Sequence, residues 1–516
     1  MAVLKLNRLM SMHRQRRRRQ IRAPNKLIVS RPKRNCLGPL QDEKSLCHHQ
    51  IKGYSLPNLP EDIWCQIHSL MAMQDAARVA CVSQAFLHSW RCHPNLSFSE
   101  ETLGLNKNGC EKGDEKAKDF TVTVDHILKN HSGLGVKRLQ IKVPSVYYVK
   151  ESCHFTHLDS WLQAAVKPGI EEINLRLSTA DAEYNFPCSL LSDGTEDTLI
   201  YLLLASCNFH PTVELGCLRN LIRLQLSMVR ITGDELGCFL SNSSALEQLE
   251  LMYCNDIICL RIPCLQQLSY LEVLTCSGLQ VIESKAPNLS SFRFAGDPHV
   301  QLSLGDTLRI KKLDWFCSGA AFYACTELPF SMPNLETLKI YSKTEMINTP
   351  MVPSKFHQLK YLSVALGGRT YDYLSLVSLL DTSPSLETFI LSVQPERGRV
   401  SVFEDPSYIR RIPEQRNNKL QCVNIINFTS AKSLVELARH ILESASSLKS
   451  LTLDTSHGLP RCSVNKSGKC VYMRKDALVE AYKALLAVQT YIRSKVPSTV
   501  ELTVLEPCSR CHAVEL

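Results

Sequence analysis

Near the carboxyl end of the sequence, Cys508, Cys511 and His512 form a C-x-x-C-H motif, which is the pattern of a c-type haem attachment site. Thiolates and imidazoles also bind zinc, but a closed zinc site needs about four ligands and this motif supplies fewer. A second, weaker Cys-His-His run occupies residues 47–49. One interpretation is therefore a metal or haem enzyme, which metal analysis and an absorption spectrum would test.

Motifs of other enzyme classes are absent from the sequence. There is no phosphate-binding G-x-x-x-x-G-K-[ST] loop and no dinucleotide-binding G-x-G-x-x-G after a strand. Neither H-E-x-x-H nor G-x-S-x-G occurs, so the sequence offers no metalloprotease helix and no nucleophile elbow. The sequence therefore proposes no nucleophile and no acid/base pair, and we expect no cofactor and no bound metal.

Composition indicates a globular chain. Of the 516 residues, 44% are hydrophobic and 21% are charged. No apolar run reaches the roughly eighteen residues of a membrane helix, and no apolar block follows the basic start as in a secretory signal. The 22 cysteines are scattered. We expect reduced, mostly buried thiols and not a disulfide framework.

The first 41 residues contain twelve Lys or Arg and no acid, so the net charge of +9 falls to −3 when they are excluded. Such runs repel themselves and stay disordered. The arm could serve as a nuclear-import signal or make weak nucleic-acid contacts, and the alternative is a solvated tail without a role. Deletion of residues 1–41 would test the import signal. The arm has no aromatic residue for base stacking, so no nucleic-acid partner is expected. The possible import run consists of Arg14, Arg16, Arg17, Arg18, Arg19, Arg31, Lys33 and Arg34.

From about residue 120 an apolar-x-x-apolar-x-apolar unit repeats thirteen times, at spacings of 21 to 34 residues. The last apolar positions alternate with polar ones as on a half-buried strand. Residues 234–240 and 373–380 shift to helical spacing, so most units are expected to return through a helix or an irregular segment. Stacked units of this kind predict a curved solenoid of leucine-rich repeats, with parallel strands on its concave face. Cys207, Cys254 and Cys276 occupy the buried Asn/Cys position of such repeats. The units begin at Val136, Ile170, Leu199, Leu221, Leu246, Leu268, Leu289, Ile310, Leu335, Leu359, Leu386, Leu420 and Leu448.

Residues 55–98 predict three short helices. Proline suits the first position of the first helix, and Ile63, Ile67 and Leu70 form one apolar stripe along it. The second helix is expected from Gln74 to Cys81 and the third from Ser83 to Trp90. About forty residues cannot bury a large core alone, so another part of the chain or a partner must cover their apolar surface.

This helical block resembles an F-box, and its sequence is similar to that of plant F-box proteins that carry leucine-rich repeats. The resemblance implies docking on a Skp-family adaptor and, through it, on a cullin. Ala72 and Gln84 depart from the family pattern, which has proline and a basic residue at these positions. The residues expected to bind the adaptor are Leu59, Pro60, Ile63, Ile67, Leu70, Val82, Ser83 and Trp90.

The carboxyl-terminal part has helical patterns at 433–448 and 476–496 and a strand-like segment at 500–505. This order resembles the FBD domain of plant F-box proteins, and it would cap the last repeat. The predicted fold is α+β or α/β, a three-helix F-box, a repeat solenoid and an α/β cap. The expected domains are a basic arm and linker at 1–54, the F-box at 55–98, a linker at 99–119, repeats at 120–410 and the cap at 411–516.

The resemblance implies a non-catalytic substrate-recognition subunit of a Skp-cullin-F-box ubiquitin ligase, located in the nucleus, the cytoplasm or both, whose repeats bind an unidentified target protein. The alternative is a non-enzymatic leucine-rich-repeat interaction scaffold, nuclear or not, that has no link to ubiquitin. Co-purification with a Skp-family adaptor separates these interpretations.

Overall fold

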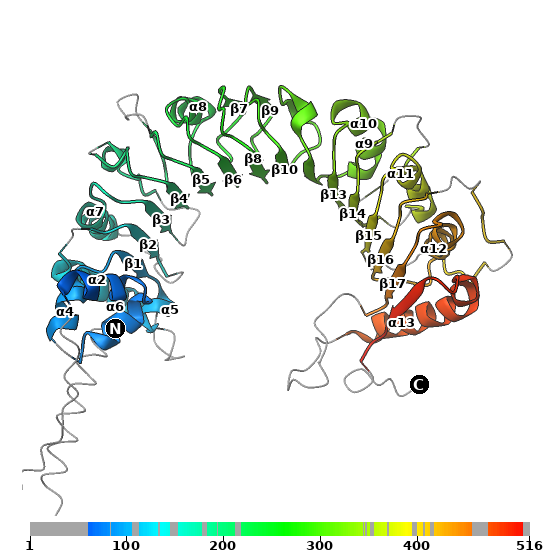
Figure 1. Ribbon diagram of the computed structural model, residues 1–516, viewed down its shortest axis with the longest axis horizontal. Helices are drawn as coiled ribbons and strands as arrows, with labels where there is room; N and C mark the ends of the chain where they lie inside the picture. Colours follow the sequence, from blue (N-terminus) through cyan, green and yellow to red (C-terminus); the bar gives the residue numbers. More distant parts are fainter. Residues whose placement is uncertain are drawn as a thin grey trace, which may run out of the picture. The chain divides into compact units, whose positions relative to one another are not determined.

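Parallel strands recur along the chain in the computed structural model, which divides into two compact units (Figure 1). The first unit is Met1–Thr179 with Asp193–Thr195, and the second is Ala180–Ser192 with Glu196–Leu516. The structure describes residues 60–82, 84–105, 113–132, 135–144, 153–177, 183–192, 194–211, 218–343, 345, 348–350, 355–368, 371–394, 400–405, 408–412, 417–456 and 473–508. The predicted arm at 1–54 and its import run, together with Leu59, Ser83, Cys511 and His512, lie outside these residues.

The first unit contains helices and a short parallel sheet. Its helices are α2 (Glu61–Ser69), α3 (Met73–Val79), α4 (Gln84–Arg91), α5 (Glu100–Leu103), α6 (Gly113–Asn130) and α7 (Cys153–Ala165). Its strands are β1 (Asn95–Phe98), β2 (Arg138–Lys142) and β3 (Glu172–Arg176), in the order β1-β2-β3. Strand β1 lies within the block expected to be helical, and it forms because Leu96 and Phe98 pair in register with Leu139 and Ile141 and are buried.

The prediction of a linker at 99–119 is wrong in part, because helices occupy both of its ends. Ser99 and Thr102 form a capping box that starts α5. Helix α6 already begins at Gly113 and buries Phe120 and Val124 on one face. The Lys, Asp and Glu residues on the other face of α6 gave this segment a linker-like composition.

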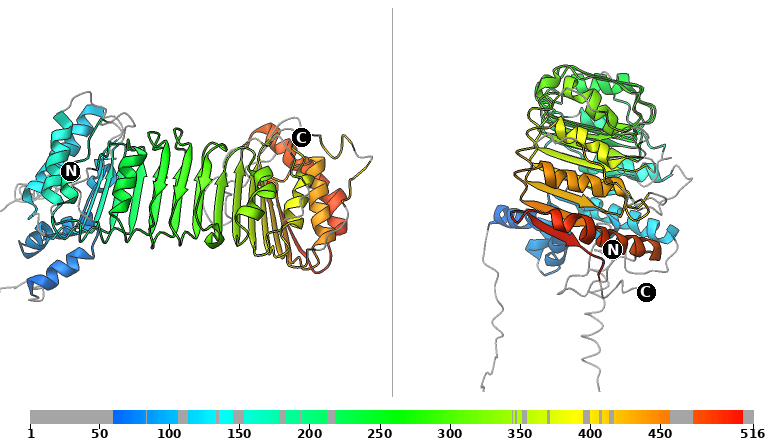
Figure 2. Two further views of the ribbon diagram at one scale, coloured as in Figure 1. Left: turned by 90° about the horizontal axis from the view of Figure 1, so that it is seen from above. Right: turned by 90° about the vertical axis from the view of Figure 1, so that its right-hand side faces the viewer.

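The second unit is a stack of parallel strands, and it confirms the predicted solenoid. Figure 1 shows its strands on the inner, concave side and its helices on the outer side, and Figure 2 shows the strands side by side. The strands are β4 (Tyr201–Ala205), β5 (Arg223–Ser227), β6 (Gln248–Met252), β8 (Tyr270–Leu274), β10 (Ser291–Ala295), β12 (Lys312–Phe316), β13 (Thr337–Ser342), β14 (Tyr361–Leu366), β15 (Thr388–Val393), β16 (Cys422–Ile426), β17 (Ser450–Asp454) and β18 (Glu501–Leu505).

Each of the thirteen predicted units contains a strand that begins two residues after its first apolar position. The apolar positions point into the core, as Leu224 and Leu226 of β5 and Leu249 and Leu251 of β6 illustrate with no exposed surface. Their polar neighbours therefore face the opposite side of the sheet. The predicted Asn/Cys positions are buried as well, since Cys207, Cys254 and Cys276 are at most 7% exposed.

The return segments correct one expectation. Three of them are strands and not helices: β7 (Cys259–Ile262), β9 (Val281–Ser284) and β11 (Gln301–Ser303), which pair as a second parallel sheet. They belong to the units of 21 or 22 residues that begin at Leu246, Leu268 and Leu289. A helix rises only about 1.5 Å per residue, so these short units lack the residues for a helical return.

Several of the longer units return through helices. These helices are α8 (Gly233–Ser241), α9 (Ala320–Thr326), α10 (Leu328–Ser331), α11 (Val377–Asp381), α12 (Lys432–Ser444) and α13 (Lys475–Ala487). Shorter helical segments are the 3₁₀ turns η2 (Cys188–Leu191), η3 (Thr307–Arg309), η4 (Tyr373–Leu376) and η6 (Arg493–Lys495) and the π-helical turn η5 (Val488–Ile492), and η3 lies in the 21-residue unit that begins at Leu289. The carboxyl-terminal part, expected to be a cap that continues the repeats, extends the parallel order as β16-β17-β18. Among the described residues, no helix is long and apolar enough to cross a bilayer.

Candidate functional site

Helices α2, α3 and α4 enclose a small core of their own. The ring of Trp64 on α2 packs edge to face against Phe86 on α4, with 4.8 Å between the ring centroids. Met73 and Ala76 on α3 are buried beside them. Gln74 donates a hydrogen bond from Nε2 to the carbonyl oxygen of Glu101 at 2.9 Å, which ties α3 to α5. The three helices are therefore held in place before any partner binds.

Several residues predicted to bind an adaptor lie outside that core. Leu70, which follows α2, is 88% exposed, and Val82, which precedes α4, is 74% exposed. Ile67 is 39% exposed. Leu70 and Val82 therefore present most of their apolar surface to a partner, and Ile67 presents a smaller part.

The other predicted residues have different environments. Pro60 is the N-cap of α2 and its carbonyl oxygen accepts the first hydrogen bond of the helix, from the Ile63 N–H. Ile63 is half-buried, and so is Trp90, whose ring lies 5.7 Å from that of His93. The structure thus divides the predicted set into exposed apolar side chains and residues that shape the helices. It also adds Leu87 on α4, 37% exposed, which the sequence analysis did not select.

Two buried imidazoles stand behind this surface. His68 on α2 and His93 after α4 are each 1% exposed. Burial lowers the pKa of both, and the nearby His93 lowers the pKa of His68 further. His93 is held by the Met71 carbonyl oxygen, 3.3 Å from Nε2, and by the Asn95 N–H, which donates to Nδ1 at 3.2 Å. Among the residues that the structure describes, neither ring nitrogen of His68 has a hydrogen-bond partner. Both rings are therefore neutral near pH 7.

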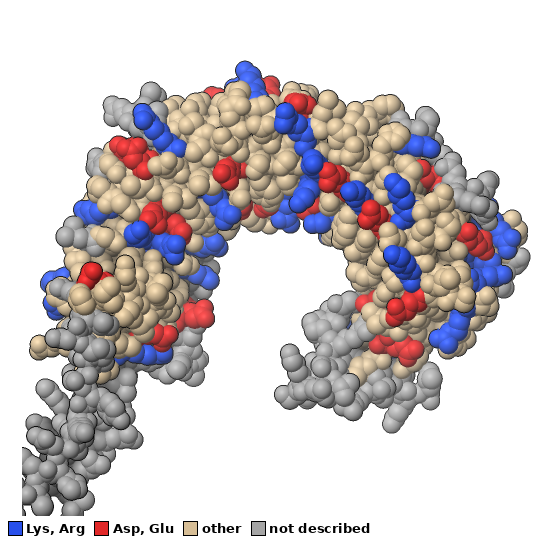
Figure 3. Space-filling view, viewed as in Figure 1, with Lys and Arg blue, Asp and Glu red and all other residues tan. Residues whose placement is uncertain are grey.

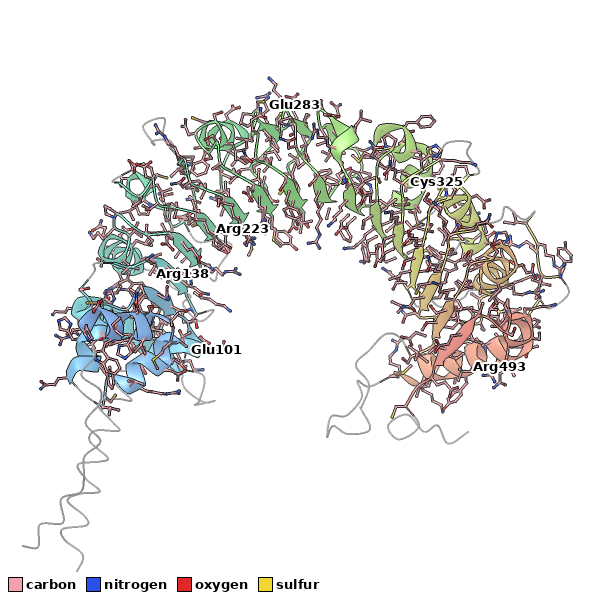
Figure 4. All side chains as sticks on the ribbon, in the orientation of Figure 1. Glu101, Arg138, Arg223, Glu283, Cys325 and Arg493 are labelled. Carbon is pink, nitrogen blue, oxygen red and sulfur yellow. The ribbon has the colours of Figure 1, made fainter. Side chains whose placement is uncertain are left out.

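A second candidate surface is the open strand face of the second unit, formed by the strand side chains that point away from its core. Its middle positions from β5 to β13 form a central row of polar residues: Gln225, Glu250, Glu272, Arg293, Asp314 and Lys339. Figure 4 shows Arg223 on this inner side and Glu283 on the outer side. This row was not identified from the sequence. The alternation with apolar positions shows that these residues face away from the core, but it does not show which of them become neighbours on adjacent strands.

Ion pairs connect most of the central row. Arg293 Nη1 lies 3.0 Å from Glu272 Oε2 and Arg293 Nε lies 3.8 Å from Asp314 Oδ2, while Lys339 Nζ is 3.5 Å from Asp314 Oδ2. Tyr270 donates from its hydroxyl to Glu272 Oε2 at 2.5 Å, and burial together with Glu272 raises the pKa of Tyr270. Figure 3 shows acidic and basic side chains interspersed on the face in view. The electrostatic selection of a ligand therefore depends on individual charged side chains and not on a large region of one charge sign.

The carboxyl-terminal cysteine motif is described only in part. Cys508 follows β18 and is half-buried, whereas Cys511 and His512 lie outside the described residues. No group of three or more His, Cys, Asp or Glu side chains could hold a metal ion in the part of the chain that the structure describes.

Comparison with known proteins agrees with this architecture. A leucine-rich-repeat family, described as "At1g61320/AtMIF1, LRR domain", matches residues 127–509. The chain is 24% identical over 203 residues to F-box/LRR-repeat protein At3g58940 of Arabidopsis thaliana, which covers 38% of this chain and only 31% of that protein. It is 23% identical over 355 residues to F-box/LRR-repeat protein At4g14096 of the same plant, covering 65% of this chain and 72% of that protein. It is 20% identical over 422 residues to F-box/FBD/LRR-repeat protein At1g13570, also from that plant, covering 78% of this chain and 91% of that protein.

Proposed function

The chain belongs to the leucine-rich-repeat family described as "At1g61320/AtMIF1, LRR domain", and on this basis we propose that it is the substrate-recognition subunit of a Skp-cullin-F-box ubiquitin ligase. Helices α2–α4 dock on the Skp-family adaptor, and the repeats hold a target protein. The chain itself forms no covalent bond. It acts by holding the target near the ubiquitin carrier, which raises the effective concentration of the reacting groups.

The observation that carries this proposal is the exposure of Leu70 and Val82, at 88% and 74%, beside helices that already have a core. Burial of one such side chain at an interface contributes about 1.5–3 kcal/mol. The names of the related plant F-box proteins support the same assignment of this block.

Affinity for the adaptor tests the proposal. We expect Leu70→Ala and Val82→Ala each to weaken binding of a purified Skp-family adaptor by about tenfold, because each removes most of one buried side chain. Titration calorimetry on the full chain measures the dissociation constants. Leu308→Ala is the matched control, since Leu308 is 57% exposed on η3 of the second unit, and it should leave adaptor affinity unchanged.

Replacement of Leu59 and Pro60 by alanine extends the test to the residues that precede α2, and it should abolish the association. Unchanged affinity in the Leu70→Ala/Val82→Ala double variant would contradict the proposal. The chain would then be better described as a repeat scaffold without a link to ubiquitin.

A further inference from the structure

The open strand face of the second unit has an apolar border where β5, β6 and β8 end. Met228 and Tyr253 directly follow β5 and β6 and are 40% and 47% exposed. Their backbones adopt φ angles of 53° and 54°, in the left-handed region. The Met228 N–H donates to the Met252 carbonyl oxygen at 2.7 Å, and the Tyr253 N–H donates to that of Leu274 at 2.9 Å. These bonds fix the border, so its apolar side chains are presented by a rigid backbone.

Glu250 lies beside this border at the middle of β6. Its neighbours Leu249 and Leu251 are fully buried, so the Glu250 side chain points away from the core. Glu250 is half-buried and has no hydrogen bond or ion pair in the described chain. Burial raises the pKa of Glu250, and the carboxylate of Glu272, in register on β8, raises it further. No cation of the described residues therefore forms an ion pair with this carboxylate.

The two arginines that influence Glu250 electrostatically each make closer contacts with other side chains. Arg293 pairs with Glu272 at 3.0 Å. Arg223 donates from Nε to Gln248 Oε1 at 2.7 Å, and its guanidinium lies 5.6 Å from the centroid of the Tyr201 ring. Both arginines lower the pKa of Glu250 only as secondary influences. A close partner for Glu250 must therefore come from outside the described chain.

We propose that this part of the open strand face binds a short extended segment of a partner protein in which a lysine or arginine is flanked by apolar side chains. The cation pairs with Glu250, and the apolar side chains pack on Met228, Met252, Tyr253 and Leu274. The inference rests on the proposed function in one respect, that the repeats hold a target protein. It adds the chemistry that selects the target, which is an ion pair between the partner's cation and the half-buried Glu250, next to the apolar side chains of the border.

Selection from a library of randomised short peptides displayed on phage tests this inference, with the full chain as bait. Glu250→Lys reverses the charge, and Glu250→Gln removes the charge without adding another. Glu283→Lys is the matched control, because Glu283 is an exposed glutamate of β9 on the outer sheet. Binding of the Skp-family adaptor to each preparation is measured in parallel.

We expect the peptides selected by the wild-type chain to be enriched in Lys or Arg beside apolar residues. Their affinity for the Glu250→Lys and Glu250→Gln chains should fall by about tenfold or more, while Glu283→Lys should have no effect. Enrichment of Lys alone or Arg alone identifies which cation the site prefers. A library without enrichment, enrichment of acidic peptides, or binding that is indifferent to Glu250 would overturn the inference. If the wild-type chain does not bind the adaptor but still binds peptides in a Glu250-dependent way, the proposed function is overturned and the inference stands.

Discussion

Ala72 stands where the F-box pattern has a proline, and the structure explains why the helical turn is nonetheless preserved. Ala72 is the N-cap of α3 with φ −62°, close to the value that a proline ring imposes. Its carbonyl oxygen accepts hydrogen bonds from the Asp75 and Ala76 N–H groups, and its own N–H donates none within the described residues. The alanine therefore reproduces the backbone that proline would fix.

We predict that Ala72→Pro raises the free energy of unfolding of the first unit by about 0.5–1 kcal/mol. The substitution restricts the unfolded chain, while the folded conformation already suits proline. Urea denaturation followed by tryptophan fluorescence measures the change. A loss of stability would mean that the backbone at this turn is incompatible with proline, and that the departure from the family pattern is structural.

Polar residues mark the limit of prediction at this scale. The buried positions of β5 and β6 were predictable, because side chains alternate between the two faces of a strand and the apolar set must lie on the face that covers the core. The pairing of Arg293 with Glu272 and the unpaired state of Glu250 were not predictable. They depend on which strands become neighbours and how far each side chain is desolvated, which the residue types alone do not contain.

The α2–α4 helices depend on neutral histidines, and this makes their stability sensitive to pH. Burial lowers the pKa of His68 and His93 below the ordinary value of 6.5. The unfolded chain therefore takes up protons before the folded chain does. Stability that is fully present above about pH 6.5 is lost as the pH falls.

We predict that His68→Phe reduces this loss, because phenylalanine keeps a ring against Phe86 without a titrating group. Removal of ring nitrogens that lack partners should also stabilise the helices at neutral pH. Unfolding monitored at pH 7.5 and pH 5.5 by tryptophan fluorescence measures both effects. An identical pH dependence in wild type and variant would show that His68 makes no contribution.

The short repeats stack closely enough to require glycine at one contact. A Cβ added to Gly278 would lie 2.1 Å from the carbonyl oxygen of Asn255, in the preceding repeat. We predict that Gly278→Ala destabilises the second unit by about 1–3 kcal/mol, since the backbone must shift to admit a methyl group. Thermal unfolding measures the difference.

Gly237→Ala in α8 serves as the control for that prediction. The nearest atom to its added Cβ is a carbonyl oxygen at 3.6 Å, an ordinary van der Waals distance, so alanine should be neutral or stabilising there. Equal effects of the two substitutions would contradict the proposed close approach between short repeats.

Element types were predictable where one period dominated. The apolar-x-apolar pattern located the strands of the main sheet from β2 to β17, because each of these strands must alternate about a single buried face. Strand β1 was missed because its four residues are too few to stand out from the helical block. Strands β7, β9 and β11 were missed because repeat length, not periodicity, determines that the short units return without a helix.

At the scale of the whole molecule, the two units offer surfaces of different chemistry. The helices of the first unit present exposed apolar side chains such as Leu70 and Val82, which suits a stable interface. The open strand face of the second unit combines an apolar border with ion pairs and an unpaired carboxylate, which suits selection of one ligand among many. The architecture was predictable from the repeats, but the identity of the target was not, because exposed strand positions carry no general code.

Hydrogen–deuterium exchange of the full chain, with and without a purified Skp-family adaptor, tests the assignment of these two surfaces most directly. The adaptor should slow amide exchange in Glu61–Arg91, where α2–α4 and their exposed apolar side chains lie, and leave the strands of the second unit unchanged. Slowed exchange on β5–β13 with no change in α2–α4, or no change anywhere, would contradict the account.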